Sequence, residues 1–412
     1  MSRLPALAVL ALNPTDSVTH GFLPAAARLG LDVTVLTEPR YVAAHRDAYA
    51  GQDRFDAGRV AVAPCEVTDF REVVATLARQ PAPDAVFSNS DHLQTQAALA
   101  AEWFGLPGKD WRAALRVKNK AHMRRHLADR GVDTVRSAEI AAGGDPADLL
   151  APDLTYPCVL KPREGVASED VVLAANAEEL WKRATETQAR RPGAALVAEE
   201  FLPGDLRTLE TLGDAHGTWH VLGGFRTRLS PPPYFIEEGL TWEPDPDRAV
   251  TSQVLAQLDA LGVAFGICHT EFVVDGGGRA RLVEVNYRAI GDQCDLLLAD
   301  LLEVPVFEHV LRTHLGEPLP RDLGARTGAR ARQDTPCADR PGTLTAAPQA
   351  CERTVDGCAL TYRPLRAIGE RHELYHTNRD YLGVLRVVGA EQEAVDRVAE
   401  DFLAAQRWEI TP

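Results

Sequence analysis

Apolar and polar residues repeat with two different periods along the first quarter of the chain. The runs LPALAVLAL, LDVTVLTE and APDAVFSN are short and apolar, which is typical of buried strands. The stretches HGFLPAAARLG and DHLQTQAALAAEWFG have helical periodicity and end at Gly30 and Gly105. Strands separated by helices predict a parallel sheet covered by helices, so we expect a Rossmann-like α/β domain at 1–115. Its first strand-to-helix turn, NPTDSVTHG, lacks the G-x-G-x-x-G of a dinucleotide site.

A second pattern of helices and strands predicts another unit at 116–204. The helix KNKAHMRRHLADRG stops at Gly131, and the strand-like runs TVRSAEI and CVLKP follow it. The helix NAEELWKRATETQARR has Asn176 as its predicted N-cap and Glu179 three positions on, an arrangement close to a capping box. The strand-like run ALVAEEFL ends this unit.

Two further α+β units are predicted at 205–325 and 326–412. In the first, a Pro-rich loop RLSPPPYFIEEG and a helix TSQVLAQLDALG precede HTEFVVDGGGRARLVEVN, where two strand-like runs around glycines predict a hairpin. The polar, basic segment 324–342 is predicted to be a linker or loop. Beyond it, CALTYRPLRAI and YLGVLRVVG are strand-like and EQEAVDRVAEDFLAAQ is helical.

Composition narrows the class of protein. The 412 residues are 45% hydrophobic and 25% charged, as in soluble globular proteins, and exceed what one hydrophobic core usually supports. No apolar run reaches the roughly 18 residues of a membrane span, and the seven cysteines form no Cys-x-x-Cys pair. We therefore expect a cytoplasmic protein without a disulfide framework. The net charge of -15 argues against nucleic acid or an anionic membrane as a partner.

The predicted hairpin carries the chemistry. If it turns on a two-residue loop, Gly277-Gly278, then Glu271 lies opposite Glu284, and Asn286 shares the face of Glu284. Opposed carboxylates repel each other and require a compensating cation. Ligand sets made only of oxygen favour a hard ion such as Mg²⁺. Two alternatives stay open: a three-residue loop would shift the register, and an exposed hairpin would leave both glutamates in solvent.

Four segments together resemble one family, the ATP-grasp superfamily in its carboxylate–amine ligase branch. HTEFVVDGGGRARLVEVNYRAIGD looks like its metal-binding strands, and YPCVLKPREGVAS looks like its strand, lysine and phosphate loop. ALVAEEFLPGD resembles its adenine-contacting hinge, and NKAHMRRHLADRGV resembles the segment with its other ATP lysine. The segments occur in the family's order, and the likeness covers roughly residues 5–320. It implies an ATP-grasp fold with an N-terminal Rossmann-like domain, a central lid and an α+β core.

The resemblance also implies a role for each matching residue. Lys120 and Lys161 are expected on the ATP phosphates, with Lys118 competing for the role of Lys120, and Gly165 and Ser168 are expected in the covering loop. The remaining predicted residues are the hinge Glu199, Glu200, Phe201 and Leu202, the Mg²⁺ (or Mn²⁺) ligands Glu271, Glu284 and Asn286, and Arg288 at the transferred phosphoryl group.

This sequence departs from the family pattern in two places. The loop REGVASED is poorer in glycine than most phosphate-covering loops of the family. Leu206 stands where many relatives have a glutamate that holds the ribose, so Asp205 or Glu210 is expected to take that role.

By resemblance, the reaction is ATP-dependent formation of an amide or peptide bond through an acyl phosphate, with release of ADP and phosphate. The substrates are expected to be a small carboxylate and an amine, in a siderophore or peptide natural-product pathway. Arg226, Arg228 and Arg288 are candidates to hold a substrate carboxylate, and Asp292 is a candidate to hold an ammonium group. A homodimer is also expected from the resemblance.

Two other functions are open from the sequence. The run HELYH at 372–376 matches the zinc-peptidase pattern H-E-x-x-H, but its strand-like surroundings argue against the helix that this chemistry requires. The second alternative is a protein of the same fold that binds a nucleotide without catalysis. The full set of carboxylates, amide and arginine around the predicted metal site argues against that alternative.

Overall fold

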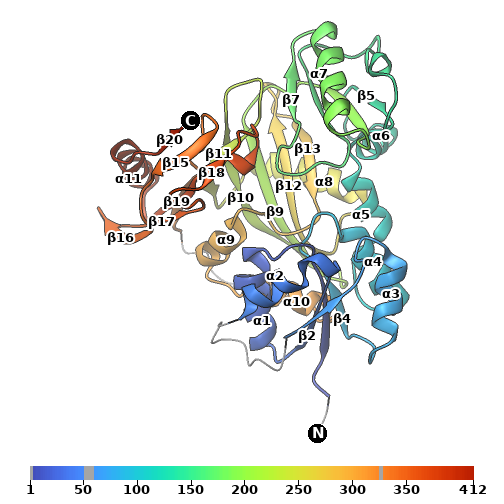
Figure 1. Ribbon diagram of the computed structural model, residues 1–412. Coiled ribbons are helices and arrows are strands. Elements are labelled where there is room, and N and C mark those ends of the chain that lie inside the picture. The colour runs from blue at the N-terminus through green and yellow to red at the C-terminus, as the bar shows by residue number, and fades with distance from the viewer. Residues whose placement is uncertain (1–2, 51–59, 324–327) are drawn as a thin grey trace.

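The computed structural model describes residues 3–50, 60–323 and 328–412 (Figure 1). The N-terminal domain has a parallel sheet, as predicted, and its strand order is β3-β2-β1-β4. Its elements are β1 (Ala6–Leu10), a short π-helix (Ser17–Phe22), α1 (Leu23–Arg28), β2 (Asp32–Thr37), a 3-10 turn (Pro39–Tyr41), α2 (Val42–Tyr49), β3 (Val60–Pro64), α3 (Phe70–Ala78), β4 (Ala85–Phe87) and α4 (Gln94–Trp103). The strand residues Val9 and Val35 are fully buried because helices cover the sheet.

The central part forms a lid with an antiparallel sheet in the order β5-β8-β6-β7. Its elements are α5 (Trp111–Lys118), α6 (Lys120–Asp129), β5 (Ser137–Ile140), a 3-10 turn (Pro146–Leu149), β6 (Cys158–Pro162), β7 (Val172–Ala174), α7 (Ala177–Arg190) and β8 (Leu196–Glu200). Asn176 caps α7 as predicted, and its side chain accepts a hydrogen bond of 3.0 Å from the Glu179 amide.

Core and C-terminal strands share one sheet. Among the described residues it has nine strands, in the order β13-β12-β9-β10-β11-β14-β19-β17-β16. The core elements are β9 (Leu206–Gly213), β10 (Trp219–Leu229), β11 (Glu237–Glu243), α8 (Arg248–Leu261), β12 (Gly266–Val274), β13 (Ala280–Asn286), α9 (Cys294–Leu302) and α10 (Val306–His314). The C-terminal elements are β14 (Arg330–Asp334), β15 (Gly342–Ala346), β16 (Cys351–Val355), β17 (Cys358–Pro364), β18 (Arg371–His372), a 3-10 turn (Asn378–Asp380), β19 (Gly383–Gly389), α11 (Gln392–Ala405) and β20 (Glu409–Thr411).

The C-terminal part is therefore joined to the core by backbone hydrogen bonds. The predicted boundary between 325 and 326 lies outside the described residues, but β11 pairs with β14 across it. The prediction of a linker over 324–342 is wrong at β14. This strand escaped prediction because Arg332 and Asp334 are polar yet largely or fully buried, where they pair with each other at 2.8 Å.

Aromatic packing fixes the N-terminal domain against the core. The Phe22 ring lies 4.5 Å from Phe87 of β4 and 4.9 Å from Phe307 of α10, measured between centroids. Such contacts hold the N-terminal sheet at a set position beside the core sheet. No helix among the described residues is long and apolar enough to cross a membrane.

Candidate active site

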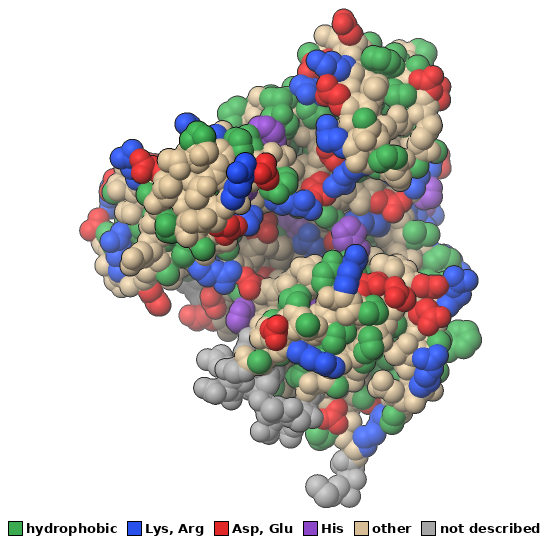
Figure 2. Space-filling model, in the orientation of Figure 1, with side chains coloured by type: hydrophobic (Ala, Val, Ile, Leu, Met, Phe, Trp, Pro, Cys, Tyr) green, Lys and Arg blue, Asp and Glu red, His purple; other side chains and the backbone are tan. Residues whose placement is uncertain are grey.

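A cavity of about 840 Å³ lies where all four parts of the chain meet. Figure 2 shows the molecule hollowed between its lower lobe, the N-terminal domain, and the two upper lobes. The predicted residues that line this cavity are Lys120, Lys161, Gly165, Ser168, Glu199, Glu200, Phe201, Leu202, Glu271, Glu284, Asn286, Arg288 and Asp292. Residues 89–92 of the N-terminal domain, at the carboxyl end of β4, also line it.

The hairpin brings Glu271 directly opposite Glu284, as predicted, but by a different route. Asp275 pairs with Arg279 around a three-residue loop that ends at Gly278 in the left-handed region, so the predicted two-residue loop is wrong. That loop alone would shift the register by one residue. A bulge at Val283 restores it, because Phe272 faces Leu282 while Glu271 faces Glu284.

Each of the two carboxylates has its own cation in the structure. Glu284 accepts a hydrogen bond of 2.7 Å from Lys120 Nζ, whose side chain is 4% exposed. Burial lowers the pKa of Lys120, but the hydrogen bond and charge of Glu284, together with the charges of Asp91 and Glu199, outweigh burial and raise it. Glu271 contacts His269 Nε2 at 3.3 Å and accepts a hydrogen bond of 3.2 Å from Asn286 Nδ2. The repulsion between the opposed carboxylates is thus balanced by one lysine and one histidine.

His269 is a site residue that the sequence did not reveal. Its Nδ1 lies 2.7 Å from Glu210 Oε1, and the Glu210 carboxylate is fully buried. Burial lowers the pKa of His269, but Glu210 and then Glu271 raise it to about 10. The imidazole is therefore cationic at neutral pH. Burial raises the pKa of Glu271, but the hydrogen bond and charge of His269, together with the charges of Lys120 and Arg288, outweigh burial and lower it. Glu210, expected as a ribose ligand, is occupied by His269 instead.

The donor set suits a divalent oxygen-loving cation. Glu271, Glu284 and Asn286 offer two carboxylates and one amide oxygen on adjacent strands, which is the ligand chemistry of Mg²⁺. Among the described residues, no group of three His, Cys, Asp or Glu side chains is placed to hold a metal ion. Any magnesium here would therefore rely on the amide and on ligands from a substrate.

The second predicted lysine belongs to a buried three-residue network. Lys161 Nζ lies 2.7 Å from Glu199 Oε2, and Arg124 donates to both oxygens of the same carboxylate at 3.0 and 2.8 Å. Burial raises the pKa of Glu199, but Arg124 and Lys161 outweigh it and lower the pKa to about 2. Lys118, the competitor of Lys120, instead pairs with Asp91 and lies outside the cavity lining.

Part of the predicted hinge is already engaged in backbone hydrogen bonds. Glu199 pairs with β5 and β6 inside the lid sheet, the Glu200 amide donates to Arg136 O at 2.9 Å, and the Phe201 amide donates to Pro157 O at 3.1 Å. These amides are therefore not available to a ligand, which leaves Leu202 as the hinge residue whose amide could contact one.

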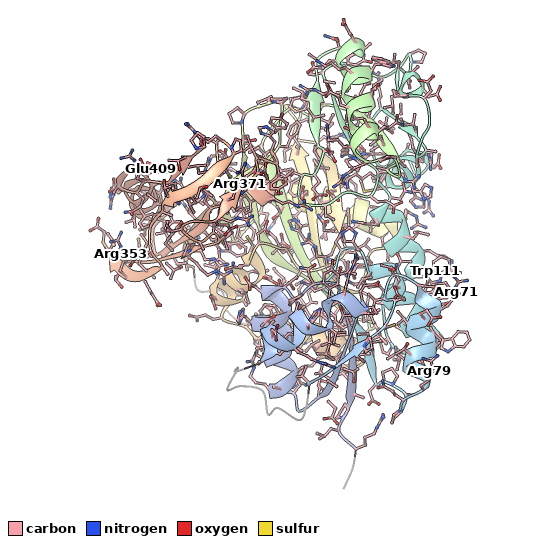
Figure 3. The ribbon with its side chains drawn as sticks, viewed as in Figure 1. Arg71, Arg79, Trp111, Arg353, Arg371 and Glu409 are labelled. Atoms are coloured by element: carbon pink, nitrogen blue, oxygen red, sulfur yellow. The ribbon has the colours of Figure 1, made fainter. Side chains whose placement is uncertain are left out.

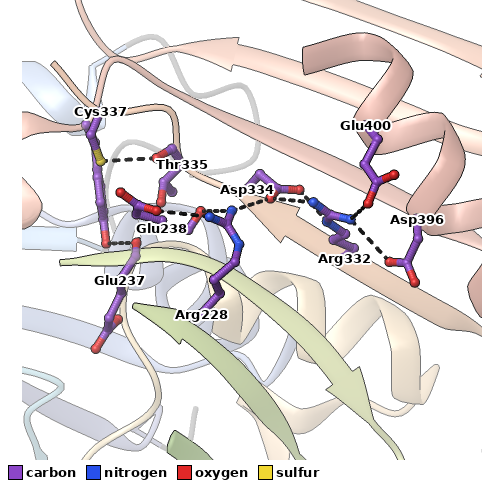
Figure 4. Close-up of polar contacts among 10 residues, drawn as sticks. Arg228, Glu237, Glu238, Arg332, Asp334, Thr335, Cys337, Asp396 and Glu400 are labelled. Atoms are coloured by element: carbon purple, nitrogen blue, oxygen red, sulfur yellow. Dashed lines mark hydrogen bonds and ion pairs between the residues drawn. The ribbon is translucent and has the colours of Figure 1, made fainter. Parts of the chain in front are cut away.

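Besides Lys118 and Glu210, three more predicted site residues lie away from the cavity lining. Arg226 pairs with Glu243 at 3.2 Å, and Asp205 is exposed beside Gly204. Arg228 pairs with Glu238 at 2.9 Å and with Asp334 of β14 at 2.8 Å (Figure 4). The structure thus uses Arg228 to join the core to the C-terminal strands, because Asp334 is buried and needs a counter-charge.

Glu237 is a cavity residue that the sequence placed only in a loop. It begins β11, where its carbonyl oxygen accepts hydrogen bonds from Thr335 Oγ1 at 2.7 Å and Tyr381 Oη at 2.8 Å. Burial, and then the nearby charges of Glu271 and Asp292, raise the pKa of its carboxyl group to about 8. Burial also raises the pKa of Asp292.

The HELYH segment is not a zinc site. It forms the short strand β18 followed by a turn, so the helix that would bring both histidines to one metal is absent from this described segment. His372 Nε2 bonds to Asp380 at 2.9 Å, whereas His376 stacks on Tyr234 with ring centroids 4.1 Å apart. The two histidines thus have separate partners, and the zinc-peptidase interpretation is wrong.

Comparisons with known proteins agree on one domain and one fold. Residues 154–296 match a family described as the ATP-grasp domain. An uncharacterized protein of Sinorhizobium fredii is 26% identical and aligns with 98% of this chain and 83% of its own length. The formate-dependent phosphoribosylglycinamide formyltransferase of Ignicoccus hospitalis is 28% identical over 62% of this chain and 65% of that protein. The crystal structure of an L-amino acid ligase from Bacillus licheniformis superposes on this chain with a TM-score of 0.79 and 21% sequence identity, and the superposition covers 100% of each chain.

Proposed function

Because the chain carries an ATP-grasp domain and has the ATP-grasp fold, we propose that it is an ATP-dependent carboxylate–amine ligase. One observation carries this proposal: Lys120, Lys161, Arg288 and the opposed pair Glu271 and Glu284 line a single cavity. A nucleoside triphosphate brings several negative charges, which require cationic side chains and a divalent ion in one place. The cavity supplies the cationic side chains, and Glu271, Glu284 and Asn286 would hold the divalent ion.

The proposed reaction needs no side-chain nucleophile. A substrate carboxylate oxygen attacks the γ-phosphorus of ATP, the bond to the bridging oxygen breaks, and ADP leaves with an acyl phosphate remaining. The neutral amine then attacks the carbonyl carbon, phosphate leaves, and the nitrogen loses a proton to give the amide. Magnesium, when bound, would neutralise charge on the phosphates.

Each side chain then has a defined task. Lys120 and Lys161 would bind phosphate oxygens, and Glu271, Glu284 and Asn286 would hold the divalent ion. Arg288 would stabilise charge on the phosphoryl group during both steps. Positioning and charge neutralisation, rather than covalent catalysis, would thus supply most of the rate.

The likeness to the L-amino acid ligase includes the C-terminal part of this chain. It supports an amino acid or a related small acid and amine as substrates, and we place the reaction in the synthesis of a siderophore or a peptide natural product. Asp292, which lines the cavity and has a raised pKa, is proposed to contact the amine.

The test is substrate-dependent release of ADP with a panel of amino acids, hydroxy acids and polyamines, followed by mass spectrometry of the product. A carboxylate substrate labelled with ¹⁸O should transfer one labelled oxygen to phosphate. Arg288→Ala should lower turnover by about 10²–10³, whereas Arg226→Ala, outside the cavity lining, should not. ATP binding without ADP release under any pair of substrates would favour a non-catalytic nucleotide-binding protein.

A further inference from the structure

The phosphate-covering loop of the lid has an unusual backbone for its sequence. Ala167, Ser168 and Asp170 all have φ values between 54° and 55°, in the left-handed region. Residues such as Ala and Ser rarely adopt this conformation, whereas Asp tolerates it better. A glycine-rich loop would adopt this shape at little cost. Loop 163–171 instead has Gly165 alone, so contacts from outside the loop must hold it in place.

The C-terminal part supplies two of these contacts. The backbone N–H of Asn378 donates a hydrogen bond to Ala167 O at 3.4 Å, and the Arg379 guanidinium group pairs with the Glu169 carboxylate. Glu169 also pairs with Arg191, which anchors the other side of the loop within the lid. The segment that crosses to the loop is thus the one that follows HELYH.

This segment is itself held in a fixed shape. Asp380 is fully buried, and its carboxylate accepts hydrogen bonds from the amides of Tyr375 at 2.9 Å and Thr377 at 3.3 Å and contacts His372 Nε2. Thr377 completes a capping box at the start of the 3-10 turn. The histidine of the apparent zinc motif therefore serves to orient Asn378 and Arg379.

Asn378 also lines the cavity, beside the wall formed by Glu237 and Asp292, which we call the substrate wall. Its Oδ1 accepts from the Glu237 amide at 3.4 Å, and its Nδ2 donates to Asp292 Oδ2 at 3.5 Å. The side chain and the backbone N–H of Asn378 thus connect the phosphate loop, β11 and Asp292. These elements are far apart in the sequence.

We propose that Asn378 and Arg379 are positioning residues that hold loop 163–171 over the nucleotide and connect its position to the substrate wall at Asp292. This inference rests on the proposed function for its link to amide formation. A loop that is held closed keeps water away from the acyl phosphate, so each ATP consumed yields one amide. A loop that opens lets the acyl phosphate hydrolyse.

The experiment compares Arg379→Ala with Arg371→Ala in the full-length chain. Arg371, labelled in Figure 3, lies close to this segment. Its side chain is 79% exposed, and among the described residues its ion pair is with nearby Glu373. We expect Arg379→Ala to raise the Kd for MgADP and the hydrogen exchange of loop 163–171 by about two- to fivefold, the range of a partly exposed ion pair. The ratio of amide to ADP should fall, Arg379→Lys should restore it, and Arg371→Ala should match the wild type.

Two further measurements make the outcome decisive. In a Glu169→Gln background, Arg379→Ala should add little, because its partner is already neutral. Asn378→Ala should raise the KM for the amine more than it lowers kcat. Unchanged MgADP affinity and unchanged loop exchange in Arg379→Ala would overturn the proposal. If the wild-type chain binds MgADP yet forms no amide, the proposed function fails, whereas affinity and exchange still decide this inference.

Discussion

Replacing Glu284 with glutamine tests the centre of the proposed site. In the structure the Glu284 carboxylate lies 2.7 Å from Lys120 Nζ, and the two side chains are 21% and 4% exposed. Breaking a buried ion pair by removing one partner costs roughly 3–5 kcal/mol, because the other charge stays buried without compensation. Glu284 is partly exposed and glutamine still accepts a hydrogen bond, so we expect about 3 kcal/mol, the lower end of that range. Urea denaturation measures this loss in the free energy of unfolding.

The same substitution should change the metal dependence of the reaction. Glu284→Gln keeps the size of the side chain but removes the charge of one proposed Mg²⁺ ligand. The Mg²⁺ concentration for half-maximal ADP release should rise, and kcat/KM should fall by about 10²–10³. A coupled assay of ADP release at varied Mg²⁺ measures both quantities.

Glu243→Gln is a matched control. Glu243 lies on β11 of the same sheet, is 20% exposed and pairs with Arg207 at 2.8 Å, but it does not line the cavity. Its replacement should lower stability without changing the Mg²⁺ dependence. If Glu284→Gln loses stability but keeps the Mg²⁺ dependence of the wild type, Glu284 is a structural partner of Lys120 only, and the magnesium assignment is refuted.

Three further substitutions have outcomes that follow from the structure. Glu199→Gln leaves Arg124 and Lys161 buried without a counter-charge, so urea denaturation should show a loss of about 3–5 kcal/mol, and a loss below 1 kcal/mol would contradict the network. His269 has a folded pKa of about 10 against an ordinary value of 6.5, so its stabilisation is present below pH 6.5 and lost as pH rises through 10. His269→Gln should therefore flatten the dependence of stability on pH in that window, and an unchanged profile would refute the cationic assignment. Glu237 has a folded pKa of about 8 against 4.5, so the folded state binds the extra proton and loses stability as pH rises through this range. Thermal denaturation should show that the stability of Glu237→Gln relative to the wild type increases from pH 5 to pH 9. An equal difference in stability at both pH values would contradict the raised pKa.

The opposed glutamates could be predicted because a hairpin is local. Side chains on a strand alternate with period two, so the spacing of Glu284 and Asn286 places them on one face whatever the turn. The turn itself was less predictable, because the three-residue loop and the bulge at Val283 shift the register in compensating directions. With the three-residue loop, Glu271 and Glu284 face each other only because the bulge at Val283 is also present.

Other parts of the site could not be predicted, for physical reasons. β14 has a single apolar residue, Ala331, and ion pairs with Arg332 and Arg228 satisfy its buried Asp334. The same pairs direct Arg228 to Asp334, 106 residues away, and so away from the cavity. Asn378 meets Asp292 across 86 residues, and nothing near either residue in the sequence indicates that contact. Long-range pairs of polar groups depend on how whole domains pack.

The ion pairs in the cavity also determine how ATP and a divalent cation should affect each other's binding. A phosphate oxygen that takes Lys120 leaves Glu284 opposite Glu271 without its cation, which opposes binding of ATP alone. A divalent ion on the two glutamates removes that cost, and by linkage each ligand then strengthens the binding of the other. Lys161 differs, because Arg124 still pairs with both oxygens of Glu199 when Lys161 turns to a phosphate. The affinity for metal-free ATP should therefore be limited by the Lys120–Glu284 pair. Glu284→Gln should weaken the binding of MgATP, whereas its binding of metal-free ATP should equal or exceed that of the wild type.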